Sequence, residues 1–236
     1  MPTAQGCGAS RMATGRDGAW DGTWDTTWDG GDDLRQAQAI PVLILAAGAS
    51  SRMRGRDKLL EPVDGVPLLL RQVRAALQVS DKVIVALPPE PHPRHSLLHD
   101  CQVVRLSVAD AAMGMSFSLR AGIRALPAGS THVLVVLADL PELTSADMAA
   151  VMDARLLNPD ALAWRATGAN GRAGHPILFA KSLFEAFNQL RGDQGAQPVL
   201  TAVAKDVHFV PLPDLHAVTD LDTPEDWADW RNATDR

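Results

Sequence analysis

Residues 43–60 read LILAAGASSRMRGRDKLL. The run begins with apolar residues, as a strand buried on both faces does, and continues into small residues. Arg52, Arg54, Arg56 and Lys58 then occupy every second position, although the chain carries a formal net charge of −6. Because ligands of open α/β sheets bind beyond the carboxyl ends of the strands, this segment predicts an α/β fold with an anion-binding loop after its first strand.

The rest of the chain alternates between predicted strands and helices. Strands are expected at IPVLILAA (40–47), KVIVAL (82–87), QVVRLSV (102–108), HVLVVLA (132–138), ALAWRA (161–166), PILFA (176–180) and VHFVPL (207–212). Helices are expected at 67–78, 116–126, 145–157, 181–190, 198–204 and 224–231, with Ser116 and Ser145 as candidate N-caps. This alternation predicts one α/β domain over residues 39–236, with a mainly parallel sheet flanked by helices.

The composition is that of a globular protein with an excess of acidic residues. Hydrophobic residues make up 46% of the chain, charged residues 21%, and the pI is about 5.6. These values argue against a nucleic-acid or membrane-surface binder, and no apolar run reaches the ~18 residues that span a bilayer. Cys7 and Cys101 are far apart and outside any CxxC pair, which argues against a zinc site or disulfide scaffold and suits the cytoplasm.

Residues 1–38 differ from the rest of the chain and contain AWDGTWDTTWDGGDD. Trp20, Trp24 and Trp28 are spaced by four, so on a helix they would form a stripe that could dock on a partner. The surrounding Gly, Asp and Thr residues disfavour a helix. We therefore predict a disordered N-terminal extension and keep the docking stripe as the alternative.

The loop that follows the first predicted strand, called the first loop below, has the composition of a phosphate-binding site. Small side chains allow a ligand to approach the backbone amides, and the cations add charge. The segment contains neither GxGxxG nor GxxxxGK[ST], so the two common phosphate loops are excluded. The alternative is a solvated turn with surface arginines. The candidate nucleotide-binding residues here are Leu45, Ala46, Ala47, Gly48, Ser51, Arg52 and Lys58.

LAAGASSRMRGRDKLL followed by GVPLL resembles the nucleotidyltransferases of the molybdenum-cofactor (MobA-like) type. Five more segments appear in the family's order: GMSFSLRAGI (114–123), LADLP (137–141), GHPILF (174–179), RGDQGA (191–196) and DLDTPED (220–226). The resemblance implies a Rossmann-like, GT-A-like nucleotidyltransferase domain. One position departs from the pattern, because Arg54 stands between Arg-Met and Gly55, where the family commonly has Gly directly after Arg-Met.

Within that family the chain is most similar to the molybdenum cofactor cytidylyltransferases. The guanylyltransferase branch typically has Gly at the position of Ala47. The resemblance implies transfer of CMP from CTP to molybdopterin, release of pyrophosphate, Mg²⁺ as the cofactor, and a recipient molybdoenzyme as a possible partner. It also implies that Lys58 and Arg52 hold the triphosphate and that Asp139 binds the metal, which makes these three residues the catalytic candidates.

Asp139 and Asp222 are the candidate metal ligands. Asp139 directly follows the strand at 132–138, although Asp-Leu-Pro is also ordinary turn composition. The resemblance implies that a late aspartate completes the site, and we favour Asp222 over Asp220. Asp222 is equally a candidate N-cap of the last helix, and the two roles are compatible.

Two further groups of residues are candidates for substrate contacts. Gly114, Ser116 and Ser118 open a predicted helix whose N-terminus could hold the base or ribose, and plain capping by Ser116 is the alternative. The resemblance places His175 and Asp193 toward the acceptor, although a lone histidine is more often a structural hydrogen-bonding group.

Three alternative functions stay open from the sequence. One is transfer of another nucleotide, such as GMP, or transfer to another phosphate acceptor. Another is a chaperone that binds the cofactor and delivers it without catalysis. The third is an α/β binding module without magnesium-dependent triphosphate binding.

Overall fold

The computed structural model describes residues 12–14, 20–24 and 40–236. In the first part of the chain, β1 (Met12–Thr14) pairs antiparallel with β2 (Trp20–Trp24). Trp20 and Trp24 therefore belong to a strand and not to a helical stripe. Trp28 and the other residues of the predicted disordered extension lie outside the described residues.

A seven-stranded sheet forms the centre of the domain, in the order β11-β9-β10-β8-β3-β6-β7. Its strands are β3 (Val42–Leu45), β6 (Val83–Leu87), β7 (Val104–Ser107), β8 (His132–Leu137), β9 (Ala163–Thr167), β10 (Ala173–Ala180) and β11 (Val207–Pro211). β10 runs antiparallel to both of its neighbours, and the other neighbouring pairs are parallel. The predicted α/β domain with a mainly parallel sheet is confirmed.

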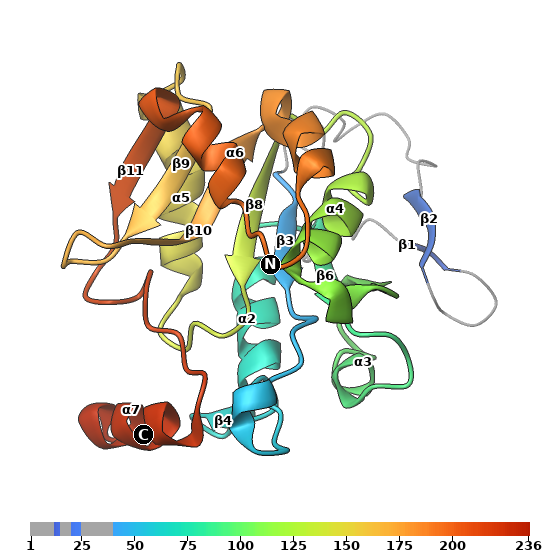
Figure 1. The fold of residues 1–236 in the computed structure, drawn as a ribbon, viewed down its shortest axis with the longest axis vertical. Helices are drawn as coiled ribbons and strands as arrows, with labels where there is room; N and C mark the ends of the chain where they lie inside the picture. The colour runs from blue at the N-terminus through green and yellow to red at the C-terminus, as the bar shows by residue number, and fades with distance from the viewer. Residues whose placement is uncertain (1–11, 15–19, 25–39) are drawn as a thin grey trace, which may run out of the picture.

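Helices cover both faces of the sheet (Figure 1). One face packs against α2 (Leu68–Leu77) and α5 (Ser145–Leu157), and the other packs against α4 (Met115–Arg124), α6 (Gln197–Ala202) and the 3-10 helix η3 (Lys181–Gln189). The last helix, α7 (Pro224–Thr234), lies beyond the end of the sheet, and its Trp227 and Trp230 join the core on the α2 face. The shorter elements are η1 (Ser51–Met53), β4 (Pro62–Val63), β5 (Val66–Pro67), α3 (Pro93–Leu97), η2 (Ala111–Met113) and η4 (Ala204–Asp206). The helix predicted at 181–190 is thus a 3-10 helix.

The apolar run of β3 feeds both hydrophobic cores. Val42 and Ile44 belong to the core on the α2 face, whereas Leu43 belongs to the core on the α4 face. All three side chains are completely buried. Successive residues of a strand point to opposite faces, so a strand covered on both sides needs consecutive apolar residues, which explains the pattern seen in the sequence.

Two predicted helix caps are wrong, because other residues occupy the N-cap positions of α4 and α5. Thr144 caps α5, because its hydroxyl accepts from the Asp147 amide while the Asp147 carboxylate accepts from the Thr144 amide. Ser145 lacks an acidic residue three positions later and cannot form this reciprocal capping box. Gly114 precedes α4, and Ser116 lies inside the helix and makes no capping bond.

Within the described part of the chain, no helix combines the length and the apolar character needed to cross a bilayer. Cys101 has a free thiol, and Cys7 lies outside the described residues.

Candidate active site

The carboxyl ends of β3 and β8 meet at one edge of the sheet. The two strands are parallel neighbours, with Leu45 opposite Leu137. The first loop therefore leaves β3 beside the segment that carries Asp139, two residues beyond β8. β6 lies on the other side of β3, with Ala86 opposite Leu45. The loops that follow β3, β6 and β8 therefore lie next to one another at the edge where open α/β sheets bind their ligands.

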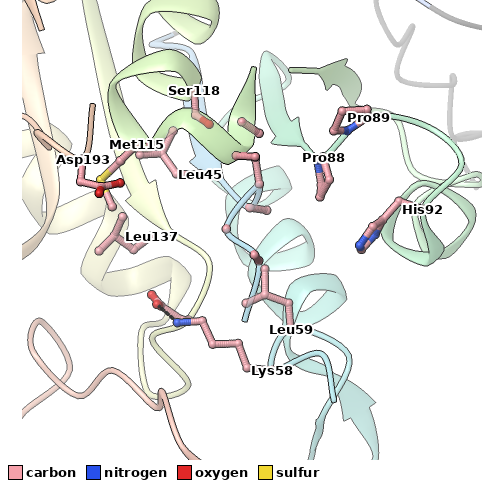
Figure 2. Close-up of a pocket in the computed structure, with 18 residues that line it drawn as sticks. Leu45, Lys58, Leu59, Pro88, Pro89, His92, Met115, Ser118, Leu137 and Asp193 are labelled. Atoms are coloured by element: carbon pink, nitrogen blue, oxygen red, sulfur yellow. Dashed lines mark hydrogen bonds and ion pairs between the residues drawn. The ribbon is translucent and has the colours of Figure 1, made fainter. Parts of the chain in front are cut away.

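A cavity of about 570 Å³ opens at this edge (Figure 2). Its wall includes the predicted residues Leu45, Ala46, Ala47, Gly48, Lys58, Gly114, Ser118, Asp139 and Asp193. It also includes residues that the sequence did not single out: Ala49, Leu59, Pro88, Pro89, His92, Ala111, Ala112, Met115 and Leu137. Five predicted residues do not line it: Ser51, Arg52, Ser116, His175 and Asp222. Of these five, Arg52 and Asp222 join the cavity wall through ion pairs.

Lys58 bridges the two predicted metal ligands. Its Nζ donates to Asp139 Oδ2 at 2.5 Å and to Asp222 Oδ1 at 2.6 Å. Arg52 Nη2 lies 2.7 Å from the other oxygen of Asp222, Oδ2. The Lys58 side chain is 13% exposed, whereas that of Arg52 is 68% exposed. The loop cations and the two acids therefore face each other at the mouth of the cavity.

The charges in this cluster are only partly satisfied. Burial disfavours the Lys58 ammonium, but attraction to Asp139 and hydrogen bonds to both carboxylates outweigh it and raise the Lys58 pKa above 10.5. Asp139 Oδ1 is buried and has no hydrogen-bond partner among the described residues. An orphaned buried oxygen is costly, and a divalent cation would satisfy it. Two carboxylates completed by phosphate oxygens and water are a ligand set that suits Mg²⁺.

Asp222 is not the cap of the last helix. Thr223 caps α7, because its Oγ1 accepts from the Asp226 amide at 3.1 Å and Asp226 Oδ2 accepts from the Thr223 amide at 2.8 Å. The capping box again falls where an acid follows three residues later. Asp226 Oδ2 also accepts from the Asp222 amide at 3.1 Å, which holds the backbone of Asp222 in place. The Asp222 carboxylate is left to Lys58 and Arg52, and the alternative Asp220 is exposed.

The first loop has three open backbone amides at the cavity wall. The backbone amides of Ala47, Gly48 and Ala49 donate to no protein acceptor in the described part of the chain. All three residues line the cavity. Successive free amides form a cradle for anionic oxygens, so the loop can bind phosphate through its backbone as well as through its cations.

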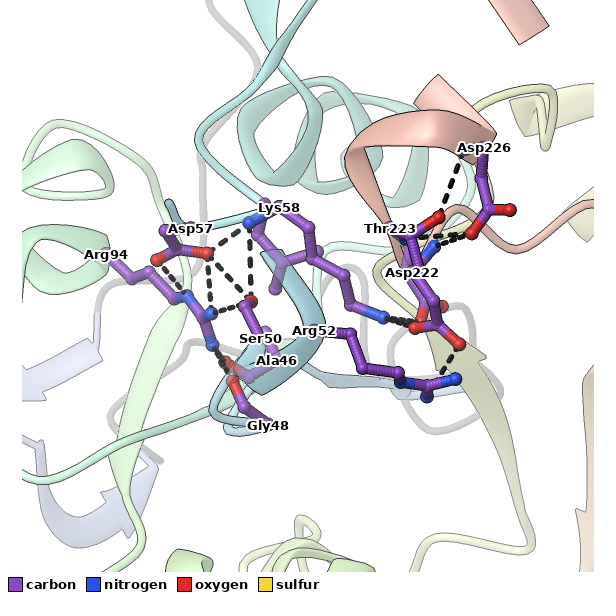
Figure 3. Close-up of polar contacts among 12 residues, drawn as sticks. Ala46, Gly48, Ser50, Arg52, Asp57, Lys58, Arg94, Asp222, Thr223 and Asp226 are labelled. Carbon is purple, nitrogen blue, oxygen red and sulfur yellow. Dashed lines mark hydrogen bonds and ion pairs between the residues drawn. The ribbon is translucent and has the colours of Figure 1, made fainter. Parts of the chain in front are cut away.

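The sequence reasoning missed Arg94 and Asp57. Arg94 is the second residue of α3, which follows β6, and its guanidinium contacts the first loop on the side that faces away from Asp222 (Figure 3). Asp57 binds it with both carboxylate oxygens, at 2.6 and 2.7 Å. Burial raises the Asp57 pKa, but the hydrogen bond and charge of Arg94 outweigh this and lower it below 3.8. The sequence did contain a clue to Arg94. The loop after KVIVAL begins at the same edge of the sheet as the first loop, so its residues can reach that loop.

The GMSFS and RGDQGA segments lie against each other. A Cβ on Gly114 would lie 2.3 Å from the Gly192 carbonyl group, and Gly114 has a φ of 120°, so only glycine fits. The Ser116 amide donates to Gly192 O at 3.1 Å. This contact brings Ser118 and Asp193 to the cavity wall. Ser116 is buried and does not belong to the cavity wall, so the nucleotide contact expected of it stays a prediction.

His175 lies at the start of β10, which enters the sheet at the cavity edge because it is antiparallel. Its amide donates to Ala217 O at 3.0 Å. Burial and the charge of Arg165 outweigh the opposing effect of Asp139 and lower the His175 pKa to about 4. The imidazole is therefore neutral near pH 7 and adds no charge to the site.

The other two loop cations lie away from the acids of the site. Arg54 pairs with Glu225 at 2.7 Å, and Arg56 pairs with Glu61 at 3.2 Å. Arg54 and Glu225 are both largely exposed, and such surface pairs contribute little. Arg54 and Gly55 both have positive φ, 53° and 87°. Arg54, the residue that departs from the family pattern, therefore adopts a left-handed conformation that normally favours glycine.

The sequence of residues 42–207 matches the family model for the MobA-like NTP transferase domain. A protein of Synechococcus elongatus, named a probable molybdenum cofactor guanylyltransferase, is 34% identical over 193 residues, which cover 78% of this chain and 94% of that protein. The purine catabolism protein PucB of Bacillus subtilis is 29% identical over 202 residues, covering 78% of this chain and 92% of PucB.

Among solved structures, that of Rv0371c from Mycobacterium tuberculosis is similar in fold. The TM-score is 0.72 at 23% sequence identity, and the match covers 82% of this chain and 98% of that one.

Proposed function

The chain belongs to the MobA-like NTP transferase family, and from this premise we propose that it transfers CMP from CTP to the terminal phosphate of a molybdopterin-type acceptor. Pyrophosphate is the other product. One observation carries the proposal: Lys58 lies between Asp139 and Asp222 at the mouth of a cavity whose first loop offers three open amides.

The reaction is an in-line displacement at the α-phosphorus of the nucleotide. A bond forms between an oxygen of the acceptor phosphate and the α-phosphorus, and the bond from that phosphorus to the pyrophosphate oxygen breaks. The acceptor phosphate is already anionic near pH 7, so no general base is needed. Catalysis then depends on alignment and on neutralising the charge that gathers around the phosphates.

Each part of the site has a role in this reaction. The amides of Ala47, Gly48 and Ala49 hold phosphate oxygens in the cradle of the first loop. Lys58 and Arg52 exchange carboxylate partners for oxygens of the triphosphate and stabilise the leaving pyrophosphate. Gly114, Ser118 and Asp193 all line the cavity. Gly114 and Ser118 contact the base or ribose in this proposal, and Asp193 contacts the acceptor.

Magnesium fits this site. Asp139 and Asp222 would hold the ion, and Asp139 Oδ1 has no competing hydrogen bond. When bound, the ion supplies positive charge to the phosphate oxygens. Lys58, which contacts both acids, is the group that gives way to it.

We propose CTP as the donor because the chain has Ala47 where the guanylyltransferase branch typically has glycine. Ala47 lines the cavity, and its methyl group takes space that a glycine would leave open. A pyrimidine needs less room than a purine. The second candidate is GTP, because the Synechococcus relative is named a guanylyltransferase. These two donors can be separated directly by binding.

Thermal unfolding in the presence of Mg²⁺ and each of CTP, GTP, UTP and ATP tests the donor. A nucleotide at a hundred times its dissociation constant stabilises a protein by about 2.7 kcal/mol, which is readily measured. We expect CTP to give the largest shift. A shift with GTP alone would assign the second candidate, and no shift with any triphosphate would reject nucleotidyl transfer. Pyrophosphate release with a molybdopterin acceptor then tests the transfer itself.

A further inference from the structure

Arg94 is a buried cation surrounded by oxygen atoms of the first loop (Figure 3). Its side chain is 1% exposed. Nη1 donates to the carbonyl oxygens of Ala46 at 2.6 Å and Gly48 at 2.8 Å. Nη2 donates to Ser50 Oγ at 3.1 Å, and Asp57 binds the guanidinium with both oxygens. A planar fork of donors suits such a set of acceptors, and a lysine ammonium does not.

These bonds determine which way the peptide groups of the loop point. The carbonyls of Ala46 and Gly48 are held on the Arg94 side of the loop. The amides of Ala47, Gly48 and Ala49 have no protein acceptor in the described residues, and these residues line the cavity. Arg94 thus fixes the two peptide groups that carry the amides of Ala47 and Ala49, and it leaves these two amides available to a ligand.

The same cluster extends to the catalytic candidate Lys58. The Lys58 amide donates to Ser50 Oγ at 3.3 Å. Asp57 Oδ1 accepts from the Leu59 amide at 3.0 Å and from Ser50 Oγ at 3.3 Å. The backbone amides of Lys58 and Leu59 therefore bond to Ser50 and Asp57, and both of these residues also bond to Arg94.

We propose that Arg94 is a positioning residue that holds the first loop in its nucleotide-binding shape before the nucleotide arrives. This inference rests on the proposed function, because it takes the loop to be the phosphate site. The loop is ordered during folding, so binding does not incur that entropy cost again. Arg94 acts through the loop and does not touch the substrate.

The test follows from how preorganisation acts on binding. When the competent loop shape is only a fraction of the population, the apparent dissociation constant rises by the inverse of that fraction. Arg94→Lys keeps the charge and loses the fork. If a tenth of the molecules retain the shape, the nucleotide dissociation constant and KM rise about tenfold. The turnover number should change little, because saturating nucleotide restores the loop.

Arg105→Lys is the matched control. Arg105 donates to the carbonyl of His95, also in α3, at 3.2 Å, and among the described residues it has no hydrogen bond or ion pair with the first loop. We expect this variant to keep the wild-type KM. An equal rise of KM in both variants would overturn the proposal, because it would show that general loosening of α3 is responsible.

Hydrogen exchange of the free protein gives a reading that needs no nucleotide. We expect the hydrogen-bonded amides of the loop, those of Met53, Lys58 and Leu59, to exchange faster in Arg94→Lys than in the wild type, while those of β3 and β8 are unchanged. Wild-type exchange in this loop would overturn the proposal. Because this measurement uses the free protein, it judges Arg94 even if the wild type binds no triphosphate and the proposed function fails.

A milder variant covers the case in which Arg94→Lys does not fold. Ser50→Ala removes one shared hydrogen-bonding group and leaves no buried charge unpaired. We expect a smaller rise in KM, with turnover retained. Restoration of Arg94→Ala by methylguanidinium would support a local role of the guanidinium. Retention of the wild-type KM by folded Ser50→Ala and Arg94→Ala proteins would overturn the proposal.

Discussion

Asp57 and Lys58 are neighbours in the sequence, yet their side chains belong to two different ion clusters on opposite sides of the first loop (Figure 3). In the Asp57 cluster, both carboxylate oxygens bind the 1% exposed Arg94, which also binds two backbone carbonyls. In the Lys58 cluster, Asp139 Oδ1 has no partner among the described residues, and Arg52 is 68% exposed.

The two clusters use similar chemical groups for different purposes. Asp57 and Arg94 satisfy one another and their surroundings, and breaking such a buried pair is costly. Lys58, Asp139 and Asp222 are close to solvent and incompletely satisfied, so they can exchange partners when phosphate and metal arrive. The extent to which hydrogen bonds are satisfied, more than charge, separates a group that fixes the loop from a group that reacts.

Asp57→Asn should have the largest effect, and it acts on stability. The substitution leaves the buried Arg94 charge unpaired, so we expect the free energy of unfolding at neutral pH to fall by about 3–5 kcal/mol. Chemical denaturation measures this directly. Asp153→Asn, at an exposed site on α5, is the control and should unfold like the wild type.

The pH dependence of that difference sharpens the prediction. The lowered Asp57 pKa means that the folded state binds this proton less readily than the unfolded state. The stabilisation is therefore present above the ordinary value of 3.8 and is lost as the pH falls through the lower folded-state pKa. We expect wild type and Asp57→Asn to converge in acid, and a constant gap would contradict this account.

Asp139→Ala should come next, and it acts on rate. Loss of one preorganised electrostatic group in an active site typically costs about 3 kcal/mol, or at least a hundredfold in turnover. Stability should change little, because Lys58 keeps Asp222 as a partner. Pyrophosphate release measures the rate, with Asp153→Ala as the control. Turnover near the wild-type value in Asp139→Ala would remove this carboxylate from the mechanism.

Lys58→Met should separate two effects of the ammonium. We expect nucleotide turnover to fall steeply, but Mn²⁺ binding to the free protein to tighten by about tenfold, since a nearby cation that competes for the same carboxylates is removed. Electron paramagnetic resonance of free Mn²⁺ measures the affinity. Unchanged or weaker binding would show that Asp139 and Asp222 do not form the metal site.

Arg54→Gly should have the smallest effect. Glycine relieves the left-handed conformation at φ 53°, which costs other residues about 1–2 kcal/mol. The greater freedom of glycine in the unfolded chain offsets about 0.5–1 kcal/mol of that gain. We expect a slight rise in the melting temperature and unchanged turnover, because Arg54 pairs only with the exposed Glu225 among the described residues. A clear loss of stability would instead assign importance to that ion pair.

Local patterns in the sequence predicted the parts of the molecule that depend on neighbouring residues. The apolar runs of β3 and β8 became the buried centre of the sheet, and their ends lie side by side because parallel neighbours finish at one edge. The same reasoning failed for helix caps. Thr144 and Thr223 are the caps because each has an acid three residues later, a pairing that residue type alone does not reveal.

The fold class, the family and the edge of the sheet where the acids and cations gather could be predicted from the sequence, because they follow from periodicity and from the order of its segments. The partner of each charged group depends on how the folded chain brings distant segments together. Asp57 and Lys58 diverge because Arg94 approaches the loop from one side and Asp222 from the other. Electrostatic and hydrogen-bond energies depend on distance and desolvation in three dimensions, and spacing along the chain does not encode them.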